Sequence, residues 1–334
     1  MKEDFRELLS IYIPTSDRAD YLKFCLNNIV NKAQRFNLKV FISDNFSQDS
    51  TEIVVNGFQK QYDNIFYYKQ KQKISLDENQ LFFLKVVDTR FCLMIADDDA
   101  LELNGLETIL YAIQNKPDID LILLNAYHYS SDMQLRKYPN INYNEDVVMD
   151  DPRKLLKNNF FDMHFSTLVL NMVHAAKVNP IKYYGTFHAY CGVAFEYLHA
   201  KYAKAGLCSI LLLSEPTIML RDGEKTYSKE TISVYYKRFP SFFLRLPEFY
   251  RKEAKIKLRQ LAKNNVTTTF LIRQKMQGTL ALGNIKETFE YLSTFQKLKV
   301  LMICLVPFAV FRVLITLYRG LLKIKHSINN DVAF

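Results

Sequence analysis

The sequence predicts an α/β fold with a doubly wound, mostly parallel sheet, followed by a basic helical region. Three observations support this: apolar segments alternate with amphipathic segments over the first third of the chain, no cysteine framework replaces such a core, and basic residues gather toward the C-terminus. At 334 residues the chain is long enough for about two domains. We predict a first domain over residues 1–230 and a basic helical region over residues 231–334.

The strand and helix segments alternate regularly. The expected strands are short, apolar and partly β-branched, as in strands buried on both faces: 8–15, 38–43, 65–69, 91–96 and 121–127. Between them, apolar residues recur at helical spacing over 19–35, 53–58, 79–87 and a helix that a capping box at Asn104 and Glu107 would open. Units of this length join through right-handed crossovers, which gives a parallel sheet with helices on both faces.

The cysteines and the first residues indicate a reducing, intracellular setting. The five cysteines are scattered and show no C-x-x-C spacing, so a disulfide scaffold and a zinc ribbon are both disfavoured. The first residues, MKEDFRELLS, carry acids where a signal peptide needs an apolar segment. We therefore expect a cytoplasmic protein.

Charge is segregated along the chain. Residues 237–334 hold 18 Lys and Arg against 5 Asp and Glu, whereas the first 236 residues hold 26 against 30. Such a basic tail needs an anionic partner, either a phospholipid surface or a nucleic acid. No nucleic-acid recognition motif accompanies it, so we expect no nucleic-acid partner.

The last residues of the basic region favour a membrane as its anionic partner. The uncharged run 301–311 is shorter than the roughly 20 residues that a spanning helix needs. Residues 310–326 have the pattern of an amphipathic helix with a basic face, suited to the headgroup layer of an anionic membrane. A helix packed on the first domain is the alternative.

Polar and acidic residues follow three of the predicted strands, at the sheet edge where ligands bind in doubly wound folds. The first strand leads from Pro14 into Thr15, Asp17 and Arg18, the second into Asp44 and Asn45, and the fourth into Asp97, Asp98 and Asp99. Crowded carboxylates repel one another unless a cation neutralises them, and oxygen ligands favour Mg²⁺ or Mn²⁺. A solvated turn is the alternative for an arbitrary Asp triplet. No glycine-rich phosphate loop occurs, so nicotinamide and P-loop sites are disfavoured.

Four segments together carry a family resemblance. They are IYIPTSDRADYL, SDNFSQDST, Asn79 ahead of the fourth strand, and LMIADDDALELNGLE. With them the chain resembles the family 2 glycosyltransferases, whose Rossmann-like domain is called the GT-A fold. The resemblance is closest over residues 8–125 and looser over 160–225. One departure is Asp17, where the family usually has Asn.

The resemblance implies a donor site for a nucleoside-diphosphate sugar over residues 1–125 and an acceptor side over 126–230. The residues implied in nucleotide binding are Pro14, Thr15, Asp17, Arg18, Asp44, Asn45, Asn79, Asp97 and Asp98. Asp97 and Asp99 are implied as the residues that hold Mn²⁺ or Mg²⁺. A UDP-sugar is the expected donor.

The catalytic base stays open between two residues. The family usually places a carboxylate at the start of a helix facing the acceptor, and residues 186–206 resemble that helix without the expected Glu-Asp pair. His188 lies near its start and Glu196 two turns in; His188 is favoured because an imidazole titrates near neutral pH. A structural role for His188 is the alternative. His164 and His174 are expected in a half-buried strand and turn, with a place at the acceptor site as the alternative. Arg221 would meet a phosphate, unless Asp222 and Glu224 mark a solvated loop.

The predicted function is an inverting, metal-dependent glycosyltransferase of bacterial cell-surface polysaccharide synthesis, acting on lipooligosaccharide, capsule or O-antigen. The acceptor would be a glycan or a polyprenyl- or other lipid-linked sugar, and the enzyme would be peripheral at the cytoplasmic face of the inner membrane. Two alternatives stay open. A sugar nucleotidyltransferase would begin with a glycine-rich loop and a lysine, which this chain lacks. A non-catalytic membrane adaptor with a degenerate fold would tolerate loss of the metal site.

Overall fold

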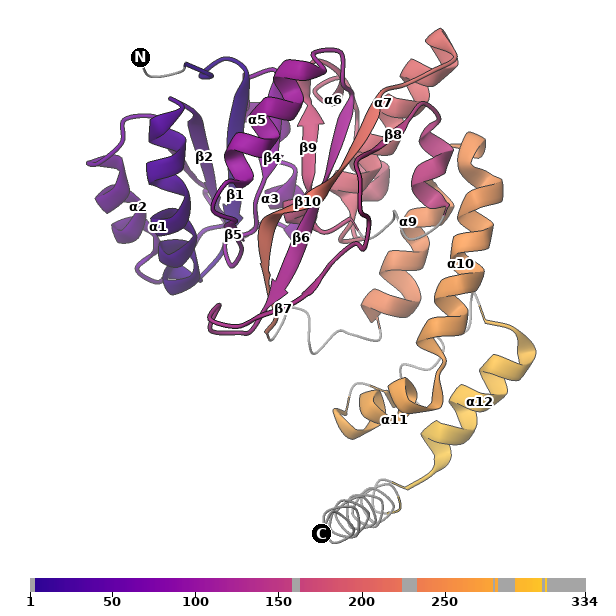
Figure 1. Cartoon of the computed structure of the whole chain (residues 1–334). Coiled ribbons are helices and arrows are strands. Elements are labelled where there is room, and N and C mark those ends of the chain that lie inside the picture. Colours follow the sequence, from indigo (N-terminus) through magenta and orange to yellow (C-terminus); the bar gives the residue numbers. More distant parts are fainter. Residues whose placement is uncertain are drawn as a thin grey trace, which may run out of the picture. The chain divides into compact units, whose positions relative to one another are not determined.

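The computed structural model describes residues 4–157, 163–223, 233–278, 280–281, 292–307 and 310 (Figure 1). The chain divides into two compact units, residues 1–224 with 244–254 and residues 225–243 with 255–334. The boundary after residue 230 and the division at residue 125 remain predictions.

A ten-stranded sheet crosses the first unit in the order β3-β2-β1-β4-β9-β6-β10-β5, with β7 paired to β6 and β8 to β10. Its strands are β1 (Leu9–Thr15), β2 (Lys39–Asp44), β3 (Ile65–Lys69), β4 (Phe91–Met94), β5 (Ala100–Leu101), β6 (Leu121–Tyr129), β7 (Arg136–Pro139), β8 (Val147–Met149), β9 (Leu168–Asn171) and β10 (Ile210–Arg221). Strands β3, β2, β1 and β4 are parallel neighbours, and β6 pairs in parallel with β10. The antiparallel β9 lies between β4 and β6. The predicted α/β fold with a mostly parallel sheet is confirmed.

Helices cover both faces of this sheet (Figure 1). The helices of the first half are α1 (Ala19–Arg35), α2 (Thr51–Gln59), α3 (Leu76–Gln80), α4 (Phe83–Val86), α5 (Gly105–Asn115), α6 (Met172–Ala175) and α7 (Ala189–Ala205). Apolar residues of α1, α2 and α5 share one buried cluster with β1, β2 and β4, because each helix turns its apolar face to the strands. Single-turn segments lie at η1 (Pro152–Leu156), η2 (Phe165–Thr167) and η3 (Ile181–Tyr183).

Two local predictions were wrong. The helix expected over 79–87 is instead the pair α3 and α4, because a capping box formed by Ser75 and Glu78 starts the first helix earlier. The capping box expected at Asn104 does not form. Asn104 makes no side-chain capping bond, and Glu107 instead accepts a hydrogen bond from Arg35 at 2.6 Å.

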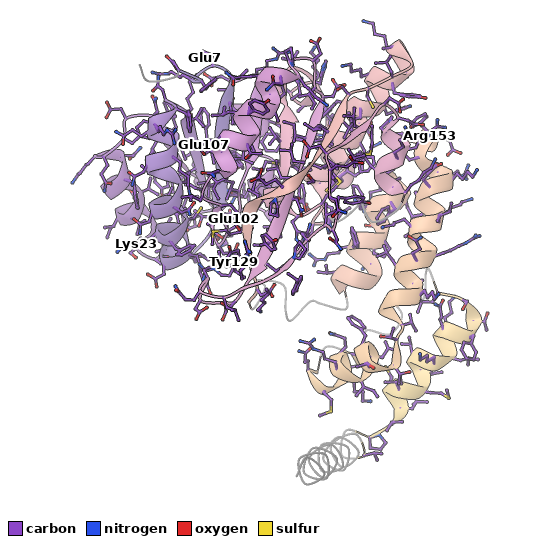
Figure 2. The ribbon with its side chains drawn as sticks, in the orientation of Figure 1. Glu7, Lys23, Glu102, Glu107, Tyr129 and Arg153 are labelled. Carbon is purple, nitrogen blue, oxygen red and sulfur yellow. The ribbon has the colours of Figure 1, made fainter. Side chains whose placement is uncertain are left out.

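The strand ends are tied together by side chains. Tyr129 at the end of β6 donates a hydrogen bond to Glu102, the residue after β5, at 2.9 Å; both are labelled in Figure 2. Asn79 of α3 donates to the carbonyls of Thr15 and Ser43 at 3.3 Å and accepts from the Ser43 hydroxyl at 2.7 Å. The carboxyl ends of β1 and β2 are thereby held side by side.

The described residues from 233 onward are mainly helical. They form η5 (Val234–Arg238), α9 (Phe239–Arg245), η6 (Glu248–Tyr250), α10 (Arg251–Asn265), α11 (Thr268–Met276) and α12 (Thr294–Leu305). Residues of α10, α11 and α12 share a small apolar core that includes Val266, Leu271, Val300 and Ile303. Within the described ranges, no helix combines the length and apolarity that crossing a membrane requires. Glu224 and the amphipathic segment 311–326 lie outside the described residues.

Candidate functional site

Three strand ends meet at one edge of the sheet, as the parallel pairing requires. Thr15 at the end of β1 pairs in register with Asp44 at the end of β2, and Pro14 with Ser43. On the other side of β1 lies β4, which leads into Asp97, and the Thr15 hydroxyl donates a hydrogen bond to Asp97 at 2.7 Å. The structure therefore brings the residues after β1, β2 and β4 together.

Arg18 bridges the aspartates that follow β4. Its guanidinium donates to Asp97 Oδ1 at 2.8 Å and to Asp98 Oδ2 at 2.6 Å. The same guanidinium lies 4.5 Å from the centre of the Tyr21 ring, a cation–π distance. Arg18 is thus held at the acidic edge by two carboxylates and one aromatic face.

Asp99 is fixed by partners that lie far away in the sequence. The Ser166 hydroxyl donates to Asp99 Oδ2 at 2.5 Å, and the backbone N–H of Arg221 donates to Asp99 Oδ1 at 3.0 Å. The Arg221 side chain donates to the carbonyl of Asp98 at 2.9 Å and to the carbonyl of Ser131 at 2.6 Å. Arg18 and Arg221 therefore both contact the Asp97–Asp99 segment.

Burial leaves negative charge at this edge poorly compensated. Burial raises the pKa of Asp97 to about 7; Arg18 acts in the opposite direction, and the charge of Asp98 raises the pKa further. Burial followed by the charge of Asp98 raises the pKa of Asp99 to about 7 as well. A bound cation would favour the ionised form of both carboxyl groups.

The donor set fits a hard divalent cation that shares its shell with a substrate. Among the described residues no group of three or more His, Cys, Asp or Glu side chains is placed to hold a metal ion. Mg²⁺ sites of substrate phosphates, however, commonly use only one or two protein carboxylates, with water and phosphate oxygens completing the shell. Asp97 and Asp99 are a pair of buried carboxylates of this kind, and their role as metal ligands remains a prediction.

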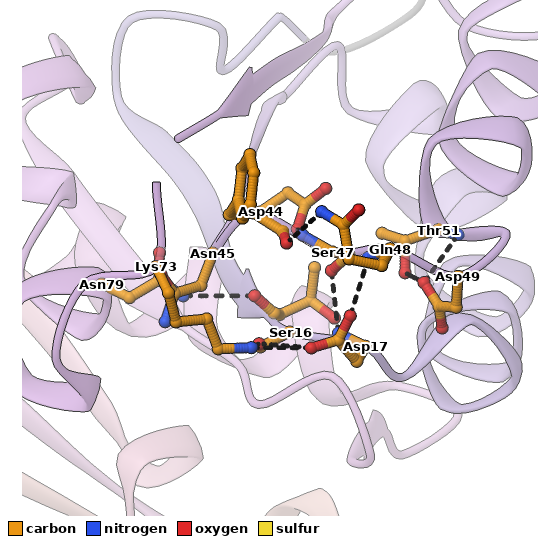
Figure 3. A network of polar contacts seen from close by, with 12 residues as sticks. Ser16, Asp17, Asp44, Asn45, Ser47, Gln48, Asp49, Thr51, Lys73 and Asn79 are labelled. Atoms are coloured by element: carbon orange, nitrogen blue, oxygen red, sulfur yellow. Dashed lines mark hydrogen bonds and ion pairs between the residues drawn. The ribbon is translucent and has the colours of Figure 1, made fainter. Parts of the chain in front are cut away.

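The loop after β1 is shaped by Asp17 (Figure 3). Asp17 has a left-handed backbone with φ of 52°, a conformation that Asp and Asn adopt more readily than other non-glycine residues. Its N–H donates to the Ser47 hydroxyl at 2.8 Å, and its carboxylate accepts from the Gln48 N–H at 2.8 Å and from Lys73 at 2.6 Å. The hydrogen bond from Lys73 lowers the pKa of Asp17. Lys73, which the sequence did not single out, balances the charge of Asp17.

The buried polar residues of the loop after β2 are occupied within the protein (Figure 3). Asp44 accepts from the Ser47 N–H at 2.9 Å and from the Tyr67 hydroxyl at 2.5 Å. Asn45 exchanges two hydrogen bonds with the backbone of Ile74, at 2.8 and 2.9 Å. These contacts hold the end of β2 and the loop after it in place, as those of Asn79 do. It remains a prediction that a nucleotide also contacts Asp44, Asn45 and Asn79.

His188 lies at the start of α7, where the sequence predicts it. It is the residue before the helix, and Phe187 ahead of it has a positive φ of 63°. The His188 Nδ1 lies 3.1 Å from the carbonyl oxygen of Thr186. Because a carbonyl only accepts, Nδ1 carries a proton, and a neutral imidazole then has its lone pair on Nε2.

A buried carboxylate of α3 supports the turn ahead of α7. Asp77 Oδ2 accepts from the backbone N–H of Gly185 at 2.7 Å and from that of Phe187 at 3.4 Å. Gly185 has a positive φ of 83°, which suits glycine. Asp77 thereby ties the turn before His188 to the helix that carries Asn79.

Glu196 is engaged by the segment that precedes α7. It accepts a hydrogen bond from the Tyr183 hydroxyl at 2.6 Å and forms an ion pair with Lys182 at 2.5 Å. Gly192, one turn before Glu196, leaves room for the Tyr183 ring, because a Cβ at Gly192 would lie 2.4 Å from that ring. These contacts favour His188 over Glu196 as the base, and both roles remain predictions.

A second histidine, His128, lies close to Arg221. No pattern in the sequence had indicated it as a site residue. His128 of β6 pairs across to β10, and its Nδ1 lies 3.0 Å from the carboxylate of Asp222. Lys137 donates to the other oxygen of Asp222 at 2.9 Å, and Tyr138 stacks on His128 with ring centres 4.7 Å apart. Asp222 is therefore engaged by a histidine and a lysine, and this group adjoins the Arg221 contact to Asp99.

His164 and His174 are half-buried, but they lie before a single-turn segment and in a short helix and not in the expected strand and turn; a place at the acceptor site stays open. His164 precedes η2 and meets the His128 ring edge-on at 5.8 Å between ring centres. His174 lies in α6, 3.6 Å from Asp120.

Comparison with known proteins assigns this domain to a family. Residues 10–175 match the sequence model of Glycosyl transferase family 2. Residues 10–175 form a domain of glycosyl transferase family 2. The family assignment rests on the part of the chain that carries β1, β2, β4 and the Asp97–Asp99 segment.

Two curated relatives resemble this family 2 domain. Abequosyltransferase RfbV of Salmonella typhimurium is 32% identical over 117 residues, which is 34% of this chain and 35% of RfbV. Minor teichoic acid biosynthesis protein GgaB of Bacillus subtilis is 22% identical over 128 residues, which is 38% of this chain and 14% of GgaB. The chain thus matches about a third or less of the length of these relatives.

The fold of the family 2 domain is also found in a solved structure. The structure of residues 1–349 of TarS from S. aureus, in complex with UDP-GlcNAc, superposes with a TM-score of 0.58 at 15% identity. The match covers 84% of this chain and 81% of that one. At this identity the likeness concerns the fold, and it agrees with the predicted GT-A architecture.

Proposed function

We propose that this chain is an inverting, metal-dependent glycosyltransferase that moves a sugar from a nucleoside-diphosphate donor to a glycan or lipid-linked acceptor. The observation that carries this proposal is the pair of buried carboxylates, Asp97 and Asp99, at the carboxyl edge of a family 2 domain with two arginines against them. The names of the relatives support a role in bacterial cell-surface polysaccharide synthesis. The complex of TarS with UDP-GlcNAc supports a UDP-sugar as donor.

The donor would be held by the residues after β1 and β4. The Thr15 hydroxyl and Arg18 fix Asp97, and Ser166 with the Arg221 backbone fixes Asp99, so both carboxylates are oriented before a ligand arrives. When bound on Asp97 and Asp99, Mn²⁺ or Mg²⁺ would neutralise charge on the leaving nucleoside diphosphate. Arg18 and Arg221 would add positive charge where the diphosphate lies.

The acceptor hydroxyl needs a base, and we assign this role to His188. In an inverting displacement the acceptor oxygen bonds to the anomeric carbon as the bond from that carbon to the phosphate oxygen breaks. The Thr186 carbonyl sets the tautomer of His188, so that Nε2 takes the proton. Asp77 positions this histidine through the turn that precedes it.

The proposal includes a peripheral place at the cytoplasmic face of the inner membrane, where lipid-linked acceptors are available. The 18 basic residues against 5 acidic ones over 237–334 support it. Release of the protein from membranes by high salt, or by deletion of residues 297–334, is the expected behaviour of a surface-attached protein. Resistance to both treatments would contradict it.

A donor screen tests the proposed activity. The full chain is incubated with Mn²⁺ and UDP-, GDP-, CDP- and dTDP-linked sugars, and release of the nucleoside diphosphate is measured. Hydrolysis of at least one donor, abolished by EDTA and by Asp99→Ala, is expected. If the intact protein hydrolyses none of them, a non-catalytic adaptor with a degenerate fold is favoured. Formation of a nucleoside triphosphate and a sugar 1-phosphate when pyrophosphate is added to the donor would instead indicate nucleotidyltransferase chemistry.

A further inference from the structure

Helix α12 is apolar on two opposite faces. A capping box formed by Ser293 and Gln296 starts the helix. Its inner face contributes Val300, Ile303 and Cys304 to the apolar core shared with α10 and α11. This packing fixes which side of α12 faces the rest of its unit.

The outer face of α12 carries four exposed apolar side chains. Phe295, Leu298, Met302 and Leu305 have exposed fractions of 79%, 54%, 63% and 60%. Their spacing of three, four and three residues places them along one side of the helix. A row of exposed apolar side chains along one side of a helix marks an interaction surface, so this outer face needs a partner.

The charge of the surrounding sequence indicates which partner fits the outer face of α12. Between residues 255 and 330 the chain has 13 Lys and Arg residues, and its only acidic residues are Glu287 and Glu290. Lys299 follows Phe295 by four residues and falls about 40° from it around the helix. Exposed apolar residues beside cations on one helix are typical of helices that lie in the headgroup layer of an anionic bilayer.

We propose that the apolar face of α12, formed by Phe295, Leu298, Met302 and Leu305, is the surface by which this chain lies on an anionic phospholipid bilayer. The apolar side chains enter the boundary between headgroups and acyl chains, and the lysines meet lipid phosphates. The inference rests on the proposed function, since it supplies the surface that keeps the enzyme beside a membrane-borne acceptor. It assigns attachment to described residues of α12, whereas the sequence pattern had indicated residues 310–326.

Vesicle binding tests the proposal without any donor or acceptor. The full chain is sedimented with vesicles of phosphatidylcholine and phosphatidylglycerol in equal amounts, and with vesicles of phosphatidylcholine alone. The wild type should bind the anionic vesicles more tightly than the vesicles of phosphatidylcholine alone. The double variant Leu298→Gln and Met302→Gln should lose roughly tenfold in affinity for the anionic vesicles. Replacing Lys299 by Gln should weaken binding about fivefold.

The matched control replaces exposed apolar residues of the other unit. Ile53 of α2 and Tyr111 of α5 have exposed fractions of 75% and 69%, and the variant Ile53→Gln with Tyr111→Gln should bind vesicles like the wild type. Circular dichroism and urea unfolding check that each variant folds. If the α12 double variant unfolds, Phe295→Gln alone replaces it, with an expected loss of about fivefold.

Three results would overturn the proposal. The first is no wild-type binding, or binding that the α12 substitutions leave unchanged. The second is a lipid-free dimer that the α12 double variant converts to a monomer, because the face would then join two copies of the chain. The third is loss of binding on deleting residues 312–334 while the α12 variant still binds. Because no sugar is transferred in this assay, a failed donor screen and a failed vesicle assay are separate outcomes.

Discussion

Replacing Asp99 by Asn should stabilise the protein in the absence of metal, and more so at higher pH. Asn has the shape of Asp: its amide oxygen accepts from the Arg221 N–H and its amide N–H donates to the Ser166 hydroxyl, in place of the two bonds that Asp99 accepts, so the substitution mainly removes a charge. The folded state raises the pKa of Asp99 from 3.8 to about 7 through burial and the nearby Asp98.

The sign and size of the change in the free energy of unfolding follow from the raised pKa of Asp99. Between pH 3.8 and about 7 the unfolded chain has lost the Asp99 proton and the folded protein retains it, so wild-type stability falls as pH rises through this range. A difference of about three pKa units corresponds to about 4 kcal/mol once both states are ionised. The advantage of Asp99→Asn over the wild type should therefore grow by about 3 kcal/mol between pH 5 and pH 8.

Urea unfolding of both proteins in EDTA at several pH values measures this difference. Carboxyl groups that do not interact with Asp99 titrate alike in both proteins, so their contributions cancel in the comparison; Asp97 and Asp98 interact with Asp99 and contribute to the measured difference. Excess Mn²⁺ should stabilise the wild type by about 2.7 kcal/mol at a hundred times its dissociation constant and leave Asp99→Asn unchanged. A pH-independent difference between the two proteins would refute the view that Asp99 carries uncompensated charge.

Four further substitutions test the site and the residues that support it. Asn79→Ala should lower the free energy of unfolding by about 2–4 kcal/mol, because it removes the amide hydrogen bonds to the Thr15 and Ser43 carbonyls and the acceptor of the buried Ser43 hydroxyl. Urea unfolding at fixed pH checks this, and a change below measurement error would contradict it. Gly192→Ala should cost about 1–3 kcal/mol by pushing on the Tyr183 ring, measured in the same way; an unchanged midpoint would show that the ring moves freely. His188→Gln should lower kcat roughly 10²–10⁴-fold with unchanged stability, whereas His128→Gln should keep kcat within about tenfold of the wild type. A larger loss of kcat in His128→Gln than in His188→Gln would make His128 the base.

Local sequence pattern was enough to predict the first part of the fold. Helix α1 spans Ala19–Arg35 and β3 spans Ile65–Lys69, the bounds that their periodicity predicts. Strand β9 was missed because an antiparallel strand inserted between β4 and β6 depends on long-range pairing. The four residues Leu168–Asn171 show no alternation that would reveal it.

The candidate site was predictable where residues follow apolar strands. Thr15, Asp44 and Asp97 were found because parallel strands deliver their C-terminal residues to one edge. Ser166 was missed because it reaches Asp99 from 67 residues away, in a segment without a motif. His128 was missed because only the register between β6 and β10 brings it to Asp222.

A crystal structure of the protein with UDP and Mn²⁺ tests the central claim most directly. The account predicts an anomalous manganese peak at coordination distance from the Asp99 carboxylate, bridging to the diphosphate of UDP. UDP bound at a different edge of the sheet, or bound beside Asp97 with no metal at Asp99 under saturating Mn²⁺, would contradict it.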